Sequence, residues 1–189
     1  GADQVADETT LPLFSAGPAK AGVASSMPTA RLVAAVTAAR ATADVVVVYL
    51  HWGFDYQTCP DERSVATARD LEAAGADVIV GAHSHRVNGA GWLGRAYVDY
   101  GLGNFVWWRS AEPDSRTGIL TLTVDRTKAS QPAQARTGPV VTSASWRPLL
   151  IGRNGIPAEP APADATRLTG LWEEARACTG LTAAPDAPG

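Results

Sequence analysis

All three histidines of the chain fall close to the ends of two predicted strands. His51 directly follows the apolar run 45–50, and His83 and His85 follow the run 77–81. In open α/β sheets, ligands bind outside the carboxyl ends of the strands, so two neighbouring strands would bring imidazoles to one edge. Neutral imidazole is a common nitrogen ligand for Zn, Mn, Fe or Ni. We therefore predict a metal site formed by these three histidines.

The spacing of His83 and His85 carries a geometric expectation. On extended backbone, residues two apart point to the same side, so both rings would face one way. Gly81 is expected to let the chain turn sharply as it leaves the strand. A single histidine at a strand end is more often a hydrogen-bonded surface group, but three histidines at two strand ends, with none elsewhere, favour metal binding.

Three imidazoles do not complete a site for two metals, because a charged bridging ligand is usually needed to hold two cations close together. Asp55 and Asp99 are nearby in the sequence, but the sequence alone does not place either one as a bridge. The alternative is a single-metal site built from the three histidines and water. A stoichiometry of one metal rather than two would distinguish it.

The elements that must position these histidines alternate along the chain. Helical spacing predicts a helix over 29–42, and a second over 62–74 that ends at Gly75. Together with the two strands, this order predicts α/β layering around a parallel segment of sheet. Later strands are expected at 96–100, 119–124 and 140–151, and a closing helix at 168–178. The expected fold class is α/β (α+β), with mixed β-sheet layers and outer helices.

A length of 189 residues suits one domain with a core. Residues 1–27 are expected to be loop-rich, with one brief strand at the apolar patch 11–14. Residues 28–179 would form the domain, and 180–189 a flexible tail. The net charge of -3 argues against a nucleic-acid partner. No apolar run approaches the ~18 residues that span a bilayer, and the first residues lack the features of a signal peptide, so either a targeting segment was removed or none existed.

Cys59 and Cys178 are too few and too far apart for a zinc motif. In an exported protein they could form a disulfide that closes a long loop, a bond worth roughly 4–5 kcal/mol in the chain-entropy model. Two unrelated free thiols are the equally compatible alternative.

Residues 51–56, 73–85 and 100–105 form three blocks that resemble the CapA family of poly-γ-glutamate capsule proteins. Residues 51–56 (HWGFDY), with Pro60 following, residues 73–85 (AAGADVIVGAHSH) and residues 100–105 (YGLGNF) match that family's blocks in order and spacing. The resemblance runs from about residue 44 to 106, a third of the chain. It implies the C-terminal half of a calcineurin-like metallophosphoesterase domain, which is a sheet sandwich with helices outside.

The resemblance also implies a centre of two divalent metal ions (Mn, Zn or Fe). His51 and His83 would bind one metal, and His85 the other. The remaining ligands would come from N-terminal GD and NNH-type blocks, which this sequence does not contain. We therefore expect a fragment or processed product whose missing N-terminal half, or a partner chain, completes the site.

Two positions depart from the family pattern. Asp55 stands where the family has glutamate, and its side chain is one methylene shorter. Gly101 stands where the family has serine. Neither change removes a metal ligand. Asp55 is the candidate catalytic residue, since a carboxylate there could assist proton transfer.

Three further residues are candidates for substrate binding. Arg86, next to His85, could meet an anionic group through its forked donors, or it is a solvated arginine. Tyr56 and Asn104 belong to the first and third family blocks, and a turn-forming role is the alternative for Asn104. The pair Trp107 and Trp108 is expected on a strand, one buried and one exposed, with an exposed substrate platform as the alternative.

Two functions follow from these expectations. The first is a metal-dependent hydrolase that acts on a phosphoester or an amide-type bond in the synthesis, release or anchoring of poly-γ-glutamate or another anionic cell-surface polymer. It would work outside the membrane of a bacterium, as an extracellular or outward-facing anchored protein. The second is a non-catalytic subunit with a vestigial metal site, which binds or guides polymer in a membrane-associated export assembly. On its own, the chain is expected to be weakly active or inactive.

Overall fold

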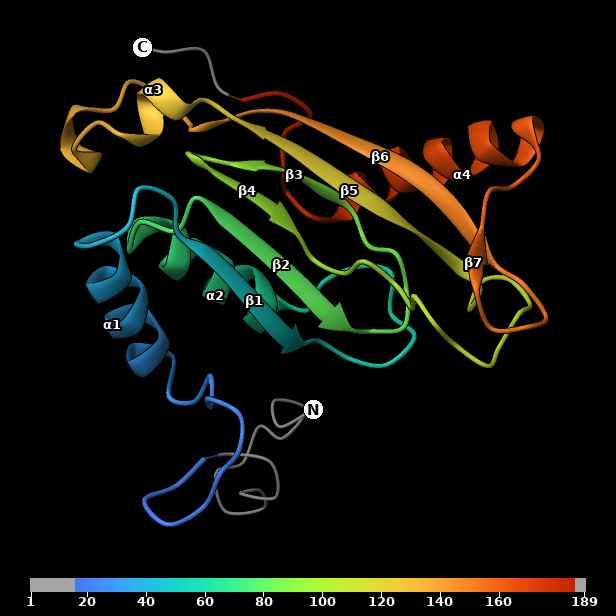
Figure 1. Ribbon diagram of the computed structural model, residues 1–189, viewed down its shortest axis with the longest axis horizontal. Helices are drawn as coiled ribbons and strands as arrows, with labels where there is room; N and C mark the ends of the chain where they lie inside the picture. The colour runs from blue at the N-terminus through green and yellow to red at the C-terminus, as the bar shows by residue number, and fades with distance from the viewer. Residues whose placement is uncertain (1–15, 186–189) are drawn as a thin grey trace.

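Two β-sheets form the centre of the computed structural model, which describes residues 16–185. The first sheet has the order β1-β2-β4-β3 and the second β5-β6-β7 (Figure 1). Their strands are β1 (Val47–Trp52), β2 (Val78–His83), β3 (Ala90–Leu93), β4 (Ala96–Asp99), β5 (Arg116–Val124), β6 (Val141–Ile151) and β7 (Pro157–Ala158). β1, β2 and β4 run parallel, while β3 and the whole second sheet are antiparallel. The predicted α/β fold class is confirmed.

Two helices cover one face of the first sheet. α1 (Thr29–Arg40) and α2 (Glu62–Ala73) lie together beneath β1 and β2 in Figure 1. β1 alternates between buried and exposed residues, so Val48, Leu50 and Trp52 point toward the helices and join one core cluster. α2 begins at Asp61, whose carboxylate accepts a hydrogen bond from the Ser64 amide at 3.0 Å and so stabilises the first turn.

A second core lies between the two sheets. Tyr97 of β4 and Val141 of β6 are buried there. α4 (Pro162–Ala175) closes this core by stacking Trp172 on Trp146, with ring centroids 5.8 Å apart. Three short helices complete the described elements: α3 (Arg126–Ala129), η2 (Ala133–Ala135) and η3 (Arg176–Cys178).

The elements that carry the histidines agree with the prediction to within about two residues at each end. The closing helix starts earlier than predicted, at Pro162, because proline is well suited to the first turn of a helix. β3, β7 and the short helices, each of four residues or fewer, were not predicted. The strand expected at Trp107 and Trp108 is absent, because that segment is an irregular loop in which Trp108 is 71% exposed.

The two ends of the described chain differ in how they are held. The apolar patch 11–14 lies outside the described residues. Leu181 is buried, and Thr182 exchanges two backbone hydrogen bonds with Trp92, at 2.9 and 3.0 Å, so these residues of the predicted tail pack onto β3. Cys59 and Cys178 form a disulfide that joins the loop after β1 to η3 across 119 residues. Within residues 16–185, no helix has the length and apolar character needed to cross a membrane.

Candidate metal centre

The three histidines meet at the carboxyl ends of β1 and β2, although the backbone differs from the extended chain we expected. His51 and His83 lie within the strands, and His85 lies just beyond β2. In the register of these strands His83 pairs with Trp52, so strict alternation would send its ring toward the helices. A φ of 108° at His83 and of 55° at His85 breaks the alternation. Such angles are uncommon for residues other than glycine and concentrate at functional sites.

The broken alternation gathers the three imidazoles into one cluster. The ring centroids of His51 and His83 are 4.5 Å apart, and those of His83 and His85 are 6.1 Å apart. Asp55 joins the cluster from the loop after β1. Its Oδ1 lies 3.5 Å from Nε2 of His83 and 3.8 Å from Nε2 of His85. The candidate catalytic carboxylate therefore stands between two candidate ligands.

Hydrogen bonds behind His85 determine which of its ring nitrogens is the donor. Asn104 donates from Nδ2 to the Asp114 carbonyl at 3.0 Å, which orients its amide so that Oδ1 faces His85. That oxygen lies 2.6 Å from Nδ1 of His85. Because an amide oxygen only accepts, Nδ1 must carry the proton, and the lone pair of His85 is left on Nε2, on the side of Asp55. Asn104 is 7% exposed and thus orients a ligand from behind.

Burial sets the protonation of the central histidine. The side chain of His83 is 8% exposed. Desolvation, with a smaller contribution from nearby His51, lowers the pKa of His83 to about 4. At neutral pH its imidazole is uncharged, which is the form that binds metals.

The other candidates flank His85. Tyr56 has a φ of 65°, and its amide donates to the Ser84 carbonyl at 2.6 Å, which ties the Asp55 loop to the histidine turn. The Tyr56 ring stacks on His85 at 5.8 Å. Arg86 donates to the carbonyl of His85 at 2.9 Å and forms an ion pair with Asp114. It is therefore not the freely solvated arginine of the alternative interpretation.

The two glycines singled out in the sequence serve close approach. We expected Gly81 to let the chain turn, but it lies inside β2. A Cβ at this position would come within 2.1 Å of the Tyr100 carbonyl oxygen and 2.2 Å of Trp52 Nε1. At Gly101, a Cβ would come within 2.1 Å of Asn88 Oδ1. The serine that the family carries at this position would not fit here without a shift.

The donor set suits a divalent cation by its chemistry, but it is incomplete. Imidazole and carboxylate together favour Zn, Mn or Fe. Among residues 16–185, however, no three His, Cys, Asp or Glu side chains are placed to hold one metal ion together. The described residues therefore do not by themselves form a metal site of three or more such ligands.

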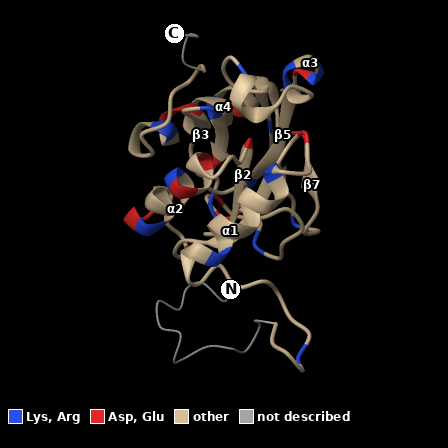
Figure 2. Ribbon diagram, turned by 90° about the vertical axis from the view of Figure 1, so that its left-hand side faces the viewer, with Lys and Arg blue, Asp and Glu red and all other residues tan. Residues whose placement is uncertain are grey.

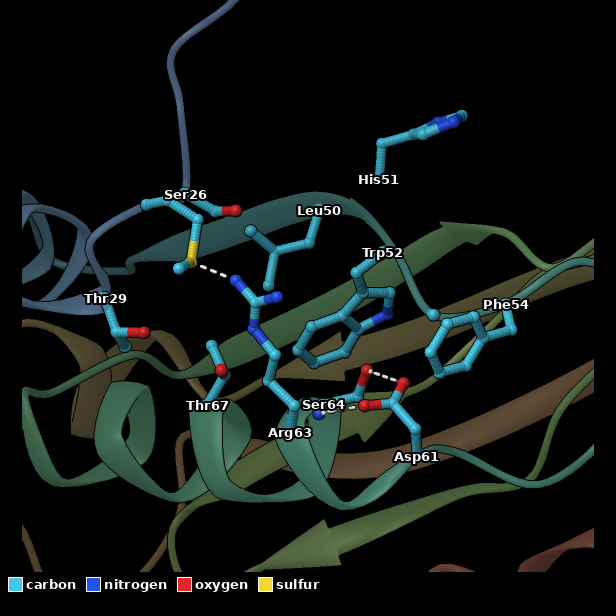
Figure 3. Close-up of a pocket in the computed structure, with 12 residues that line it drawn as sticks. Ser26, Thr29, Leu50, His51, Trp52, Phe54, Asp61, Arg63, Ser64 and Thr67 are labelled. Carbon is cyan, nitrogen blue, oxygen red and sulfur yellow. Dashed lines mark hydrogen bonds between the residues drawn. The ribbon is translucent and has the colours of Figure 1, made fainter. Parts of the chain in front are cut away.

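A pocket of about 150 Å³ adjoins this cluster on the other side of β1 (Figure 3). Leu50 and Trp52 form its wall, and Arg63 of α2 donates a hydrogen bond to the sulfur of Met27 across it. Figure 3 shows the ring of His51 pointing away from this pocket. The pocket and the imidazoles therefore belong to opposite faces of the sheet.

Comparison with known proteins shows to which family the chain belongs. The model of the family described as bacterial capsule synthesis protein PGA_cap matches residues 2–107, more than half of the chain. The chain belongs to this family. Two curated relatives are the PGA biosynthesis protein CapA of Bacillus subtilis, 40% identical over 72 residues, and the capsule biosynthesis protein CapA of Bacillus anthracis, 41% identical over 68 residues. These stretches cover 38% and 36% of this chain, but only 19% and 16% of the relatives.

The family resemblance predicted from three sequence blocks is thus confirmed. The structure also places three further residues around His85, of which the sequence pointed only to Trp107, as part of an alternative substrate platform. Trp107 stacks on His85 at 4.8 Å, and Asp114 receives ion pairs from both Arg86 and Arg109. Asp114 and Arg109 lie in a loop without a motif or periodicity, so no signal in the single sequence could have identified them.

Proposed function

We propose that this member of the PGA_cap family carries half of a metal-dependent hydrolase centre. Its substrate would be poly-γ-glutamate or another anionic cell-surface polymer, cleaved during synthesis, release or anchoring. The observation that carries the proposal is the convergence of three imidazoles from two strand ends around the carboxylate of Asp55. The names of the two Bacillus relatives support the choice of polymer.

The residues of this chain would have distinct roles. His51, His83 and His85 would hold up to two cations such as Mn, Zn or Fe. Bound divalent metal would supply Lewis acidity and lower the pKa of water. Asp55, 46% exposed and close to two imidazoles, would take a proton from the attacking water or stand between two cations. Asn104 would keep the lone pair of His85 directed toward the cluster.

We further propose that a second polypeptide segment completes the centre by docking along β1. β1 lies at one edge of the first sheet, and β5 at one edge of the second. An apolar groove of about 570 Å³ separates them, lined by Val47, Tyr49 and Ile119 among others. Val47 and Tyr49 are 61% and 67% exposed, on the same face of β1 as His51. The fitting occupant is an extended segment with apolar residues in alternation, which would pair with the free edge of β1. The N-terminal half that the family resemblance implies is the occupant we propose, ahead of a separate partner chain.

A non-catalytic function is the second candidate. The incomplete donor set of the described residues favours a vestigial metal site in a subunit that binds polymer and guides it within a membrane-associated assembly. The disulfide between Cys59 and Cys178 suits the extracellular side of the membrane, which both candidates require.

Hydrolysis assays on two proteins would separate the candidates. The isolated chain and the complete gene product, each loaded with Mn²⁺, would be incubated with poly-γ-glutamate and with bis(p-nitrophenyl) phosphate. We expect cleavage by the complete product, a loss of at least about a hundredfold in His83→Ala, and little or no activity of the isolated chain. If the complete product binds polymer without cleaving either substrate, and His83→Ala binds equally well, the non-catalytic function is correct.

A further inference from the structure

We propose that Tyr56, Trp108 and Arg109, together with Arg86, form a subsite that binds carboxylate groups of a flexible polymer chain beside His85. This inference rests on the proposed function and names the residues that would recognise the substrate. It also assigns a role to Trp108, an exposed tryptophan that does not belong to either hydrophobic core.

The side chains of the subsite form a closed circuit of neighbouring contacts. His85 stacks on Trp107, whose ring centroid is 6.0 Å from that of Trp108. The guanidinium carbon of Arg109 lies 4.6 Å from the centroid of Trp108 and 5.6 Å from that of Tyr56. Tyr56 returns to His85 by its own stacking contact. These contacts thus link His85, a candidate metal ligand, to the guanidinium group of Arg109 at the surface.

One acid serves two arginines in this circuit. Asp114 receives Arg86 on Oδ1 and Arg109 on Oδ2, so the three groups together retain one positive charge. Arg86 also lies over Tyr56, with its guanidinium carbon 4.9 Å from the ring centroid. The Arg109 side chain is 41% exposed and uses a single nitrogen in the ion pair, which leaves further N–H donors for an anion. Arginine presents these donors as a planar fork that matches a carboxylate.

The shape of the surface favours a chain with spaced carboxylates over a compact phosphate ester. The residues Tyr56 and Trp108 are 45% and 71% exposed, and both lie beside the arginines. Methylene groups between the carboxylates of a polymer would pack on these faces, while each carboxylate meets a guanidinium. Because the circuit begins at His85, a polymer held here would have its next linkage close to the imidazole cluster.

Binding of poly-γ-glutamate of defined length to the 189-residue chain would test the subsite. Affinity would be measured by calorimetry and by quenching of tryptophan fluorescence, without added metal. We expect Arg109→Gln and Trp108→Ala each to weaken binding roughly fivefold at low salt, and added salt to reduce the difference. Arg153→Gln is the matched control, since Arg153 is exposed and lies outside the circuit, and it should bind as the wild type does. Near-ultraviolet circular dichroism would confirm that each variant is folded.

The outcomes separate this inference from the proposed function. If the wild type binds the polymer, and Arg109→Gln and Trp108→Ala both bind it as tightly as Arg153→Gln does, the proposed subsite is wrong. The polymer then remains a substrate candidate. If the wild type shows no affinity for the polymer, both the subsite and the proposed substrate are wrong. If inorganic phosphate competes as strongly as the polymer at equal charge, the subsite is a general anion site and the assignment to spaced carboxylates is overturned.

Discussion

Asn104 lies behind His85 and decides which of its ring nitrogens can bind a metal. Its amide oxygen accepts a hydrogen bond from Nδ1–H of His85, and its amide nitrogen donates to the Asp114 carbonyl. At the sequence level a turn-forming role was the simpler interpretation, since the residue follows Gly103. Its contact with His85 became visible only when the fold brought residues 19 positions apart together.

We expect Asn104→Ala to weaken metal binding about 10–100-fold, because His85 would lose the partner that orients its ring. Titration calorimetry with Zn²⁺ would measure the change. Asn154→Ala, in an exposed turn after β6, is the control. Equal affinities in the two variants would show that Asn104 has no part in positioning His85.

Asp99 is a buried acid that the candidate site does not use. One of its oxygens accepts from the Gly101 amide at 2.9 Å, and within residues 16–185 the other has no hydrogen-bond partner. Burial raises the pKa of Asp99 to about 7. The folded protein therefore holds a proton there that the unfolded chain releases near pH 4.

A raised carboxyl pKa gives a stabilising contribution at low pH that is lost as the pH rises. For Asp99 this contribution is fully present below about pH 4 and is gone above about pH 7. As the pH rises through this window, the free energy of unfolding of the wild type should fall by on the order of 4 kcal/mol because of Asp99. We expect this fall to be absent in Asp99→Asn. Urea denaturation at several pH values would measure it, with the exposed Asp70→Asn as control. Parallel curves for the two variants would contradict the assignment.

At the scale of elements, the strands that carry the histidines could be predicted from the sequence. The backbone conformation that brings the imidazole rings together could not. Apolar, β-branched runs placed β1 and β2 within two residues. The positive φ angles of His83 and His85 depend on a turn held by Ser84, whose hydroxyl lies 2.8 Å from Asn88 Oδ1. No pattern in the chain marks such a contact, so the prediction of extended backbone was wrong even though the imidazoles do converge.

Two glycines offer a matched test of how tightly β2 is packed. Gly81→Ala should destabilise the fold by about 1–3 kcal/mol, because the new Cβ would meet the Tyr100 carbonyl and the Trp52 indole. Gly170→Ala, in α4, meets nothing within 4 Å and should stabilise by about 0.4–1 kcal/mol. Thermal or urea unfolding would compare them. A neutral Gly81→Ala would mean that β1, β2 and β4 pack more loosely than described.

For the whole molecule, composition and element order were sufficient to predict α/β layers, and three motif blocks were sufficient to predict the family. The pairing of Cys59 with Cys178 stayed open in the sequence, because two cysteines 119 residues apart show no spacing signal. In the structure, this bond fastens the loop that carries Asp55 to the C-terminal end of the helical segment after β7. The disulfide thus braces the Asp55 loop on one side of the histidine cluster, and the apolar groove runs along β1, the strand that carries His51.

Nitrogen NMR of the histidine side chains during titration with Zn²⁺ tests the central claim most directly. Metal binding shifts the resonance of each coordinating ring nitrogen, so the three imidazoles are observed one by one. If they share a bound cation or cation pair, His51, His83 and His85 should shift over one concentration range, with His85 keeping its proton on Nδ1. A titration that shifts His83 and His85 but leaves His51 unchanged, or that shifts none of the three, would contradict a shared metal centre.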